Sequence, residues 1–263
     1  MIIDFHTHIW PPEIAQKTLE GVQHRAKIPF YTDGTIDGLL QSMQKAGVDI
    51  SLISRITSRP DQVASVNGWL SETAKANIIP MANWLPDLSV EPDSISRLKA
   101  QGFQCMKFHP DYQGFFIDDR RMYPFYEAAQ AEEMPILIHA GLDRGLRPPW
   151  RAMPEKVAGV CRDFPNLHII AAHMGGEDNY KETEEHLLGT DIYLDTSFIL
   201  RKMPIQTLDR FIRKHPIDRI LFGSDSPWID QAKDVEYLFS LPFLSQEAKE
   251  KIAGLNAARL LRI

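Results

Sequence analysis

The stretch IIDFHTHIWPP, residues 2–12, places two histidines one residue apart at the end of a short apolar run. Side chains of an extended strand alternate between its two faces, so His6 and His8 would lie on the same side. Two imidazoles aimed at one spot are either two ligands of a metal ion or the polar positions of a half-buried strand. The pair alone leaves both interpretations open, and the partners that a metal ion needs must come from the rest of the chain.

Short apolar, often β-branched segments alternate with longer amphipathic segments along the chain. Strands are expected at 1–6, 49–54, 78–84, 103–108, 135–140, 168–173, 192–197 and 219–225. Helices are expected at 35–46, 61–76, 92–101, 122–133, 154–163, 204–214 and 231–240, with a last one from Ser245 to the end. This alternation indicates parallel strands joined by crossovers, and eight units in about 250 residues is the size of a (β/α)8 TIM barrel. An open doubly wound sheet is the alternative, but no GxGxxG follows the first strand. We expect one α/β domain over 1–263.

Composition narrows the class of partner. The chain has 263 residues, 44% of them hydrophobic, and a net charge of −6 without any run of Lys or Arg. Nucleic acid and anionic membranes are therefore not expected as partners, and a small-molecule substrate is. Cys105 and Cys161 are too few for a disulfide framework, and no secretory or membrane-spanning pattern is present, so a cytoplasmic protein is expected. A homo-oligomer is compatible with the sequence.

Polar residues gather where the predicted strands end, which is where the catalytic groups of a (β/α)8 barrel lie. These residues are His6, His8, Lys107, His109, His139, His173 and Asp225. Each has an ordinary alternative, such as a hydrogen-bonded core histidine or an aspartate that caps a turn. Imidazoles with one carboxylate suit zinc and other first-row metals and leave a coordination position open for water. The combination predicts a metal site.

The segments DFHTH, KFHP, PILIHAG, AAHMGG and FGSDSPW, in this order, resemble the amidohydrolase superfamily of metal-dependent (β/α)8-barrel hydrolases. The branch with the strongest similarity is the amidohydrolase-related group, which also contains aminocarboxymuconate-semialdehyde and resorcylate-type decarboxylases. The resemblance runs from residue 4 to about residue 228, and GLNAARLLRI is similar to the usual C-terminal ending of that group.

The resemblance implies a ligand set. His6, His8, His139 and Asp225 would hold a catalytic metal, and His173 would polarise the substrate or bind a second ion. In binuclear relatives a carboxylated lysine at the fourth strand bridges two metals, a role open to Lys107, although relatives with one metal also carry a KxHP segment. We expect one essential divalent ion, zinc with manganese or iron as alternatives, and a second ion in some preparations.

Hydrolysis is the first expectation for the reaction. A zinc-like ion lowers the pKa of bound water to about 7. Asp225 would transfer protons, and His173 would stabilise negative charge on an amide, lactone or ester substrate. A non-oxidative decarboxylase of a small aromatic or unsaturated acid is the alternative, and an inactive metal-binding scaffold is a second one. The short chain, with little room for loop insertions, favours hydrolysis.

Aromatic and basic residues near strand ends suggest how the substrate is bound. Aromatic rings at a barrel mouth suit a small planar molecule, and guanidinium groups can clamp a carboxylate. The candidates for substrate contact are Trp10, Arg55, Trp84, His109, Arg147 and Trp228. We therefore expect a small substrate that carries a carboxylate.

Overall fold

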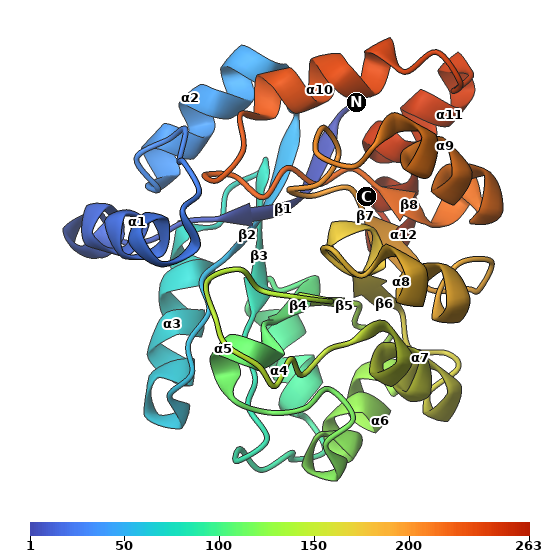
Figure 1. The fold of residues 1–263 in the computed structure, drawn as a ribbon. Coiled ribbons are helices and arrows are strands. Elements are labelled where there is room, and N and C mark those ends of the chain that lie inside the picture. The colour runs from blue at the N-terminus through green and yellow to red at the C-terminus, as the bar shows by residue number, and fades with distance from the viewer.

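Eight parallel strands form a nearly closed barrel in chain order in the computed structural model, which describes residues 1–263 (Figure 1). The strands are β1 Ile3–His8, β2 Ile50–Ser54, β3 Ile78–Ala82, β4 Cys105–Phe108, β5 Ile136–Ile138, β6 Ile169–Ala171, β7 Tyr193–Asp195 and β8 Ile220–Leu221. Backbone hydrogen bonds join the β8 segment to β1, from Phe5 N–H to the Phe222 carbonyl (2.9 Å) and from His8 N–H to the Ser226 carbonyl (2.7 Å). The predicted (β/α)8 barrel is confirmed.

Helices occupy the connections between strands. They are α1 Pro12–Ala26, α2 Ile36–Ala46, α3 Pro60–Thr73, α4 Ser94–Ala100, α5 Pro110–Gln113, α6 Tyr123–Ala131, α7 Pro154–Asp163, α8 Tyr180–His186, α9 Ile205–Lys214, α10 Gln231–Ser240, α11 Gln246–Glu250 and α12 Asn256–Leu261. Short 3-10 turns lie at Arg120–Met122, His173–Gly175 and Ile217–Arg219, and a π-helical turn lies at Lys251–Leu255. Three helices, α1, α5 and α8, were not among the predicted segments.

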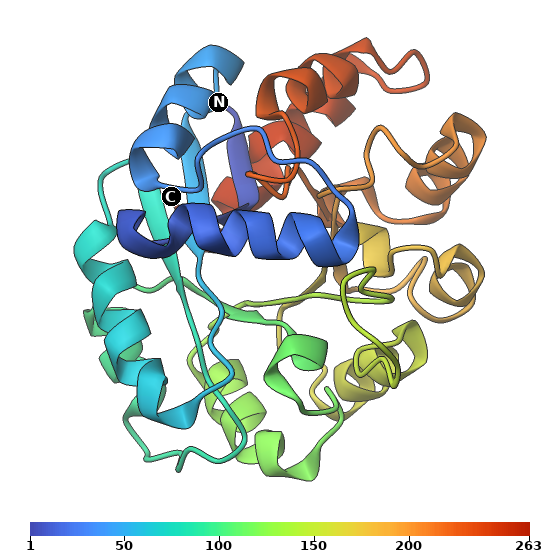
Figure 2. The same cartoon turned by 60° about the vertical axis from the view of Figure 1, so that its left-hand side comes forward.

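Helix α1 is an insertion in the first connection of the barrel. The chain passes from β1 through α1 and then α2 before it reaches β2, so α1 follows the C-terminal end of a strand. Figure 2 shows α1 running across the barrel rather than alongside it. Pro12 at its first turn fits a helix start, and Ala15 and Leu19 are its buried residues. This helix therefore helps to shape the end of the barrel where active sites form.

The barrel interior has its own apolar cluster, separate from the larger one between strands and helices. It is built from inward-facing strand residues and the last helix, and its members include Ile3, Phe5, Leu52, Met81, Cys105, Leu137, Ile170, Leu221, Ala257 and Leu261. Helix α12 thus packs its apolar residues against the strands, which explains the apolar ending of the chain. Active sites of this fold lie at the opposite, C-terminal end of the strands.

An irregularity in β1 turns its histidines into the barrel. The register with β2 shifts between Asp4 and Thr7. Such a bulge re-aims side chains, so Phe5 packs in the interior cluster and the adjacent His6 also faces inward. Gly223 leaves room for this arrangement, because a Cβ atom there would lie 2.9 Å from the Cβ atom of His6.

Gly141, just after β5, lies where the backbone of another loop leaves no space for a side chain. Its φ is +84°, and a Cβ atom would lie 2.6 Å from both the Glu177 nitrogen and the Gly176 Cα. Overpacking and the left-handed backbone together predict that Gly141→Ala lowers the free energy of unfolding by about 2–5 kcal/mol. Gly47→Ala is the matched control, since its φ is +69° with no atom within 4 Å of the added Cβ, and should cost only about 1–2 kcal/mol. Urea unfolding measures both, and equal losses would contradict the crowding at Gly141.

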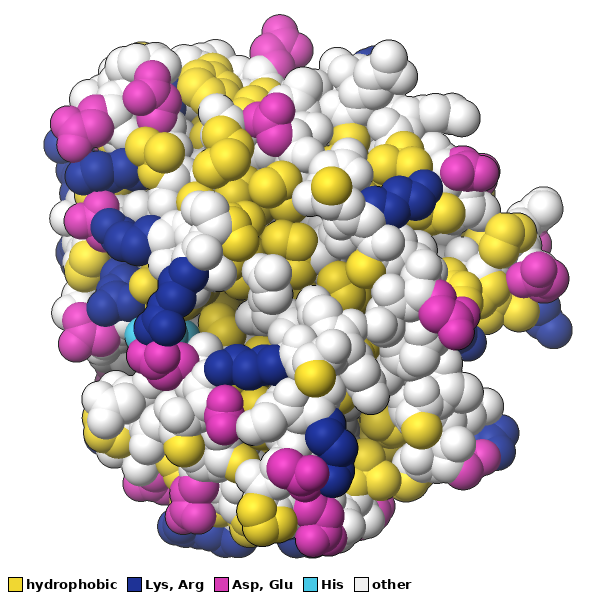
Figure 3. All heavy atoms as spheres, turned by 180° about the vertical axis from the view of Figure 1, so that it is seen from behind, with side chains coloured by type: hydrophobic (Ala, Val, Ile, Leu, Met, Phe, Trp, Pro, Cys, Tyr) yellow, Lys and Arg dark blue, Asp and Glu magenta, His cyan; other side chains and the backbone are white.

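The surface shows charges of both signs. On the face seen in Figure 3, acidic and basic side chains are interspersed around yellow apolar areas.

Cys105 and Cys161 are both free. None of the helices combines the length and the apolar character needed to cross a membrane.

Candidate active site

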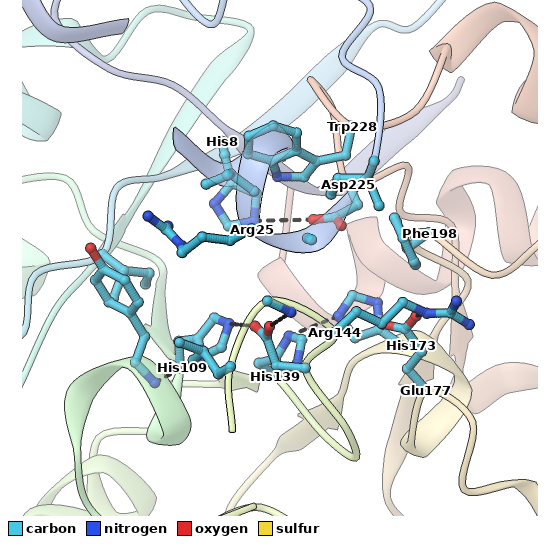
Figure 4. Close-up of a pocket in the computed structure, with 18 of the residues that line it drawn as sticks. His8, Arg25, His109, His139, Arg144, His173, Glu177, Phe198, Asp225 and Trp228 are labelled. Atoms are coloured by element: carbon cyan, nitrogen blue, oxygen red, sulfur yellow. Dashed lines mark hydrogen bonds and ion pairs between the residues drawn. The ribbon is translucent and has the colours of Figure 1, made fainter. Parts of the chain in front are cut away.

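Most of the residues predicted to form a site meet around one pocket at the C-terminal ends of the strands (Figure 4). The pocket has a volume of about 180 Å³. Its lining includes these residues from the sequence prediction: His8, Trp10, Lys107, His109, His139, His173, Asp225 and Trp228. His6 lies beside His8 and is almost fully buried. Residues far apart in the sequence thus share one cavity.

Three of the predicted metal ligands, His6, His8 and Asp225, form a compact group that we call the ligand triad. The Asp225 Oδ1 atom lies 3.1 Å from His8 Nε2 and 3.4 Å from His6 Nε2. The two Nε2 atoms are 3.2 Å apart. One atom from each residue lies within 4.8 Å of the other two, which is the spacing of groups that share one metal ion.

Hydrogen bonds on the outer side of each imidazole fix which nitrogen carries the proton. His6 Nδ1 donates to Asp195 Oδ2 (2.8 Å). His8 Nδ1 lies 2.9 Å from Ser54 Oγ, whose own hydrogen is donated to the Thr7 carbonyl, so His8 Nδ1 is the donor. Both Nε2 atoms are then left with lone pairs that face each other and a carboxylate oxygen. Acceptors that converge in this way repel one another unless a cation lies beside them. Lys107 Nζ lies 2.7 Å from His6 Nε2 in this structure, and a divalent metal ion would fit all three acceptors.

Lys107 supplies a positive charge beside the triad. Its Nζ lies 2.7 Å from His6 Nε2, and its side chain is fully buried. Burial lowers the pKa of Lys107 to about 8, opposed by the nearby carboxylates of Asp195 and Asp225. An ammonium group donates hydrogen bonds and cannot ligate a metal, so Lys107 would need to lose its proton or become carboxylated to serve as a ligand.

Burial also sets the protonation of the triad. It lowers the pKa of His6 to about 3 and moves the pKa of His8 in the same direction. For Asp225 burial alone would raise the pKa, but its interactions with His6 and His8 outweigh burial and hold the pKa at about 2. Neutral imidazoles and an ionised carboxylate are the states in which these groups bind metals.

Asp195, at the end of β7, was not singled out from the sequence, although YLDTS carries it at a strand end. This buried carboxylate accepts hydrogen bonds from His6 Nδ1, from the backbone N–H of His173 (2.9 Å) and from Ser197 Oγ (2.5 Å). Burial favours its neutral form, but His6, His173 and Ser197 outweigh burial and keep the pKa of Asp195 below its usual range. Asp195 therefore orients two histidines that come from different strands.

His139 lies with His173 and His109 rather than in the ligand triad. His139 Nδ1 is 3.0 Å from His173 Nε2, and its ring stacks on that of His109 with centroids 4.0 Å apart. His173 Nδ1 donates to the Ser197 carbonyl (3.0 Å), so its Nε2 is an acceptor. The four ligands implied by the resemblance are thus divided in this structure into a group of three and a separate histidine. The facing nitrogens of His139 and His173 are the candidate ligands for the predicted second ion.

His109 is held by hydrogen bonds at both ring nitrogens. Its Nδ1 accepts from the backbone N–H of Tyr112 (3.3 Å), so Nε2 carries the proton and donates to Asp143 Oδ2 (3.1 Å). Although His109, His139 and Asp143 also have ligand atoms within 4.8 Å of one another, the proton on His109 Nε2 prevents that atom from binding a metal. This group forms a wall of the pocket.

Two site residues adopt the left-handed backbone conformation, which is uncommon for residues other than glycine, although Asp, Asn and His adopt it more often than most. The φ angle is +59° at His173 and +69° at Asp225. Each costs about 1–2 kcal/mol, and such strain is concentrated at functional sites. The Asp225 N–H donates to the His6 carbonyl (2.8 Å), so the backbone itself ties two members of the triad together.

Aromatic rings form another wall. The rings of Trp10 and Trp228 meet edge to face with centroids 6.0 Å apart, and Trp10 stacks beside His8 at 6.1 Å. Phe198 also lines the pocket, next to His173 at 6.1 Å. These rings leave an apolar space beside the polar triad.

Three predicted substrate contacts lie elsewhere. Arg55 does not line the pocket because its guanidinium lies over the Trp69 ring, 5.6 Å from the centroid. Trp84 packs against Phe125 with centroids 5.1 Å apart and lines a different cavity between α3 and α4. Arg147 is exposed and outside the pocket lining. These three side chains therefore lie outside the pocket that contains the ligand triad.

Two other arginines line the pocket, and neither was among the substrate contacts predicted from the sequence. Arg144, from the loop after β5, is paired through Nε with Glu177 (2.6 Å) and through Nη2 with Asp178 (2.6 Å). Arg25 lies in the last turn of α1, and its exposed side chain makes no hydrogen bond or ion pair with the protein. A prediction of helix α1 would have been needed to place Arg25 beside the site, and the predicted segments did not include this helix.

The fold and the site together define a (β/α)8 barrel with a candidate metal centre at its C-terminal rim. The chain belongs to the amidohydrolase family, whose model, Amidohydrolase, matches residues 3–263. The resemblance stated from the sequence is confirmed, and the family indicates a metal-dependent enzyme of the amidohydrolase superfamily. A comparison with curated proteins finds no match.

Solved structures with the same fold include several decarboxylases. 5-Carboxyvanillate decarboxylase from Sphingomonas paucimobilis has a TM-score of 0.73 at 16% identity, with 100% of this chain and 99% of that chain covered. Dihydroxybenzoic acid decarboxylase from Polaromonas sp. JS666, with bound manganese and the inhibitor 2-nitroresorcinol, has a TM-score of 0.72 at 18% identity. The match covers 99% of this chain and 96% of that chain. An uncharacterized TIM-barrel protein from Bordetella bronchiseptica has a TM-score of 0.74 at 21% identity. The match covers 99% of this chain and 98% of that chain. At sequence identities of 16% to 21%, the structural similarity establishes the fold alone.

Proposed function

We propose that this protein is a divalent-metal-dependent, non-oxidative decarboxylase of a small aromatic carboxylic acid. The observation that carries the proposal is the pocket, where the ligand triad faces the rings of Trp10, Trp228 and Phe198. A cavity of about 150 Å³ can hold benzene, so a pocket of about 180 Å³ suits a single substituted ring. Decarboxylases of aromatic acids among the structural neighbours support this reaction over hydrolysis, which the sequence had favoured.

His6, His8 and Asp225 would hold the ion. His139, which lies 3.0 Å from His173 and outside the triad, would hold the second ion together with His173. Nitrogen and carboxylate donors suit zinc, manganese or iron, and a neighbour of the same fold contains manganese. When bound, the ion would bind substrate oxygens and offset their negative charge.

Decarboxylation requires one proton and no oxidant. The bond between the ring carbon and the carboxylate breaks, its electron pair stays on the ring carbon, and that carbon takes a proton as carbon dioxide leaves. Asp225 is ionised at neutral pH, so it would first accept a proton, for example from a hydroxyl group of the substrate, and then pass it to the carbon. This assigns Asp225 the proton transfer.

His173 would act as a hydrogen-bond acceptor. Its Nδ1 donates to the Ser197 carbonyl, so the lone pair of Nε2 is the group available on the other side of the ring. In this tautomer His173 can accept a hydrogen bond from a substrate hydroxyl but cannot donate one to developing negative charge. The role differs from the charge stabilisation expected from the sequence.

The reaction is tested with protein that is stripped of metal and reloaded with zinc or manganese. We expect carbon dioxide release from at least one ortho-hydroxylated aromatic acid, with loss of activity on chelation and recovery on reloading. In heavy water, the product should carry one deuterium at the carbon that lost carbon dioxide.

Hydrolysis of an amide, lactone or ester panel by the same preparations, without carbon dioxide release, would contradict the proposal and favour the hydrolase. Metal binding without turnover on either panel would favour the scaffold alternative. Protein treated with chelator and left without metal is the control for both panels.

A further inference from the structure

A buried carboxylate lies in the first strand, two residues before the ligand triad begins. Asp4 is completely buried, and its neighbours Ile3 and Phe5 belong to the interior cluster of the barrel. Side chains of a strand alternate between its two faces, so Asp4 points the other way, toward the layer of helices. There Gln231, the first residue of α10, donates from Nε2 to Asp4 Oδ2 (2.7 Å). Replacing buried charged groups by apolar ones often raises stability, so stability alone does not explain a carboxylate here.

The Asp4 carboxylate shapes the bulge in β1. Its Oδ1 accepts from the backbone N–H of His6 (3.1 Å), two residues further along the chain. An aspartate bonded in this way makes a local turn that competes with the regular ladder of a strand. The register with β2 shifts at this point, between Asp4 and Thr7, and His6 faces the barrel interior beside Lys107. The inward direction of His6 is thus linked to the hydrogen bond that Asp4 makes.

The same oxygen atom holds the segment that carries Asp225. Asp4 Oδ1 also accepts from the backbone N–H of Ser224 (2.9 Å), and Ser224 Oγ accepts from the N–H of Ser226 (2.9 Å). These two bonds fix the chain on both sides of Asp225, whose φ is +69°. One carboxylate therefore joins the two segments that supply all three members of the ligand triad.

We propose that Asp4 is a positioning residue of the metal centre and that Gln231 holds its carboxylate in place. Together they keep His6 and Asp225 at the spacing at which both can bind one ion. Neither Asp4 nor Gln231 lines the pocket, so neither side chain would contact a bound substrate. Groups that orient metal ligands typically contribute about 10- to 100-fold to metal affinity. The inference rests on the metal centre of the proposed function and is independent of the reaction that the metal serves.

The test compares the manganese affinities of Asp4→Ala and Asp4→Asn, and the visible spectra of the cobalt-loaded proteins, which depend on coordination geometry. Asp4→Ala should bind manganese about 10- to 100-fold more weakly than wild-type protein and change the cobalt spectrum. Asp4→Asn should stay close to wild type in both, because its Oδ1 can still accept from both N–H groups. Its Nδ2 can donate to Gln231 Oε1, which is buried and makes no hydrogen bond in the protein, once the Gln231 amide turns over.

Asp234→Ala is the matched control for loss of a buried carboxylate. Asp234 lies on α10 as Gln231 does, but it pairs with Arg201 rather than with a segment that carries metal ligands. Urea unfolding of the metal-free proteins should show a loss of stability for both Asp234→Ala and Asp4→Ala. Only Asp4→Ala should also lose metal affinity, because a general loosening of the barrel wall does not alter the spacing of the triad.

Wild-type manganese affinity in Asp4→Ala would overturn the inference. Equal losses in Asp4→Ala and Asp4→Asn would overturn it too, because charge rather than hydrogen bonding would then explain them, and so would equal losses in Asp4→Ala and Asp234→Ala. If Asp4→Ala does not fold, Gln231→Leu decides, since leucine has no group that can donate to Asp4. We expect weaker manganese binding and a changed cobalt spectrum in Gln231→Leu, and wild-type values of both would refute the inference.

This inference and the proposed function fail separately. If metal affinity depends on Asp4 but no acid is decarboxylated, the proposed function fails and the positioning role stands. Decarboxylation by wild-type protein, with wild-type metal affinity in Asp4→Ala, gives the reverse result.

Discussion

Replacing His8 with alanine is expected to lower the affinity for the catalytic metal by more than about 100-fold, since loss of groups that merely orient a ligand costs about 10- to 100-fold. Turnover should fall to the level of metal-free protein. His8 offers the lone pair of Nε2 to the ligand triad, and alanine supplies no replacement. The barrel should remain folded, because His8 lies at the edge of the buried site and the partners of its ring are Ser54 and the other two members of the triad.

Metal content after dialysis, together with circular dichroism, measures this prediction. Ser54→Ala tests the orienting hydrogen bond to His8 Nδ1 and should weaken metal binding by about 10- to 100-fold. His24→Ala, at an exposed position on α1, is the control and should bind metal normally. A His8→Ala protein that retains wild-type metal affinity would refute the triad as the metal site.

The barrel was predictable because its strands are short, apolar and separated by amphipathic helices. All eight predicted strands are present, with boundaries that differ by a few residues, such as 219–225 for β8, observed as Ile220–Leu221. This last difference has a physical cause. The segment that follows β8 keeps backbone hydrogen bonds to β1, but the positive φ of Asp225 within it is incompatible with a regular strand. The sequence pattern identifies an apolar segment, but it does not show where a functional residue ends the regular strand.

The site was predictable only in part, since strand-end positions indicate which residues converge but not how they pair. The grouping of His6, His8 and Asp225 follows from strand ends, whereas the separation of His139 depends on side-chain contacts with His173 and His109. The direction of an arginine is still less predictable, because its long side chain can fold over a neighbouring ring, as Arg55 does over Trp69.

Asp225→Asn is expected to leave the fold intact and to reduce turnover by about 10²- to 10⁴-fold, the range for loss of a group that transfers protons. Asparagine is among the few residues that readily adopt the left-handed conformation, so the φ of +69° at this position is tolerated. The amide keeps the shape of the carboxylate but cannot accept and release a proton at neutral pH. It also removes the negative charge that the two imidazoles of the triad face.

Turnover has to be measured at saturating metal, so that weaker metal binding is separated from loss of proton transfer. Asp143→Asn is the matched control: it neutralises another carboxylate of the same pocket, one that accepts from His109 and lies outside the triad. We expect a much smaller loss of turnover there. If both variants lose turnover equally at saturating metal, the effect reflects the overall charge of the pocket, and the assignment of proton transfer to Asp225 is wrong. Retention of near wild-type turnover by Asp225→Asn would contradict it as well, because the reaction would then draw its proton from another group.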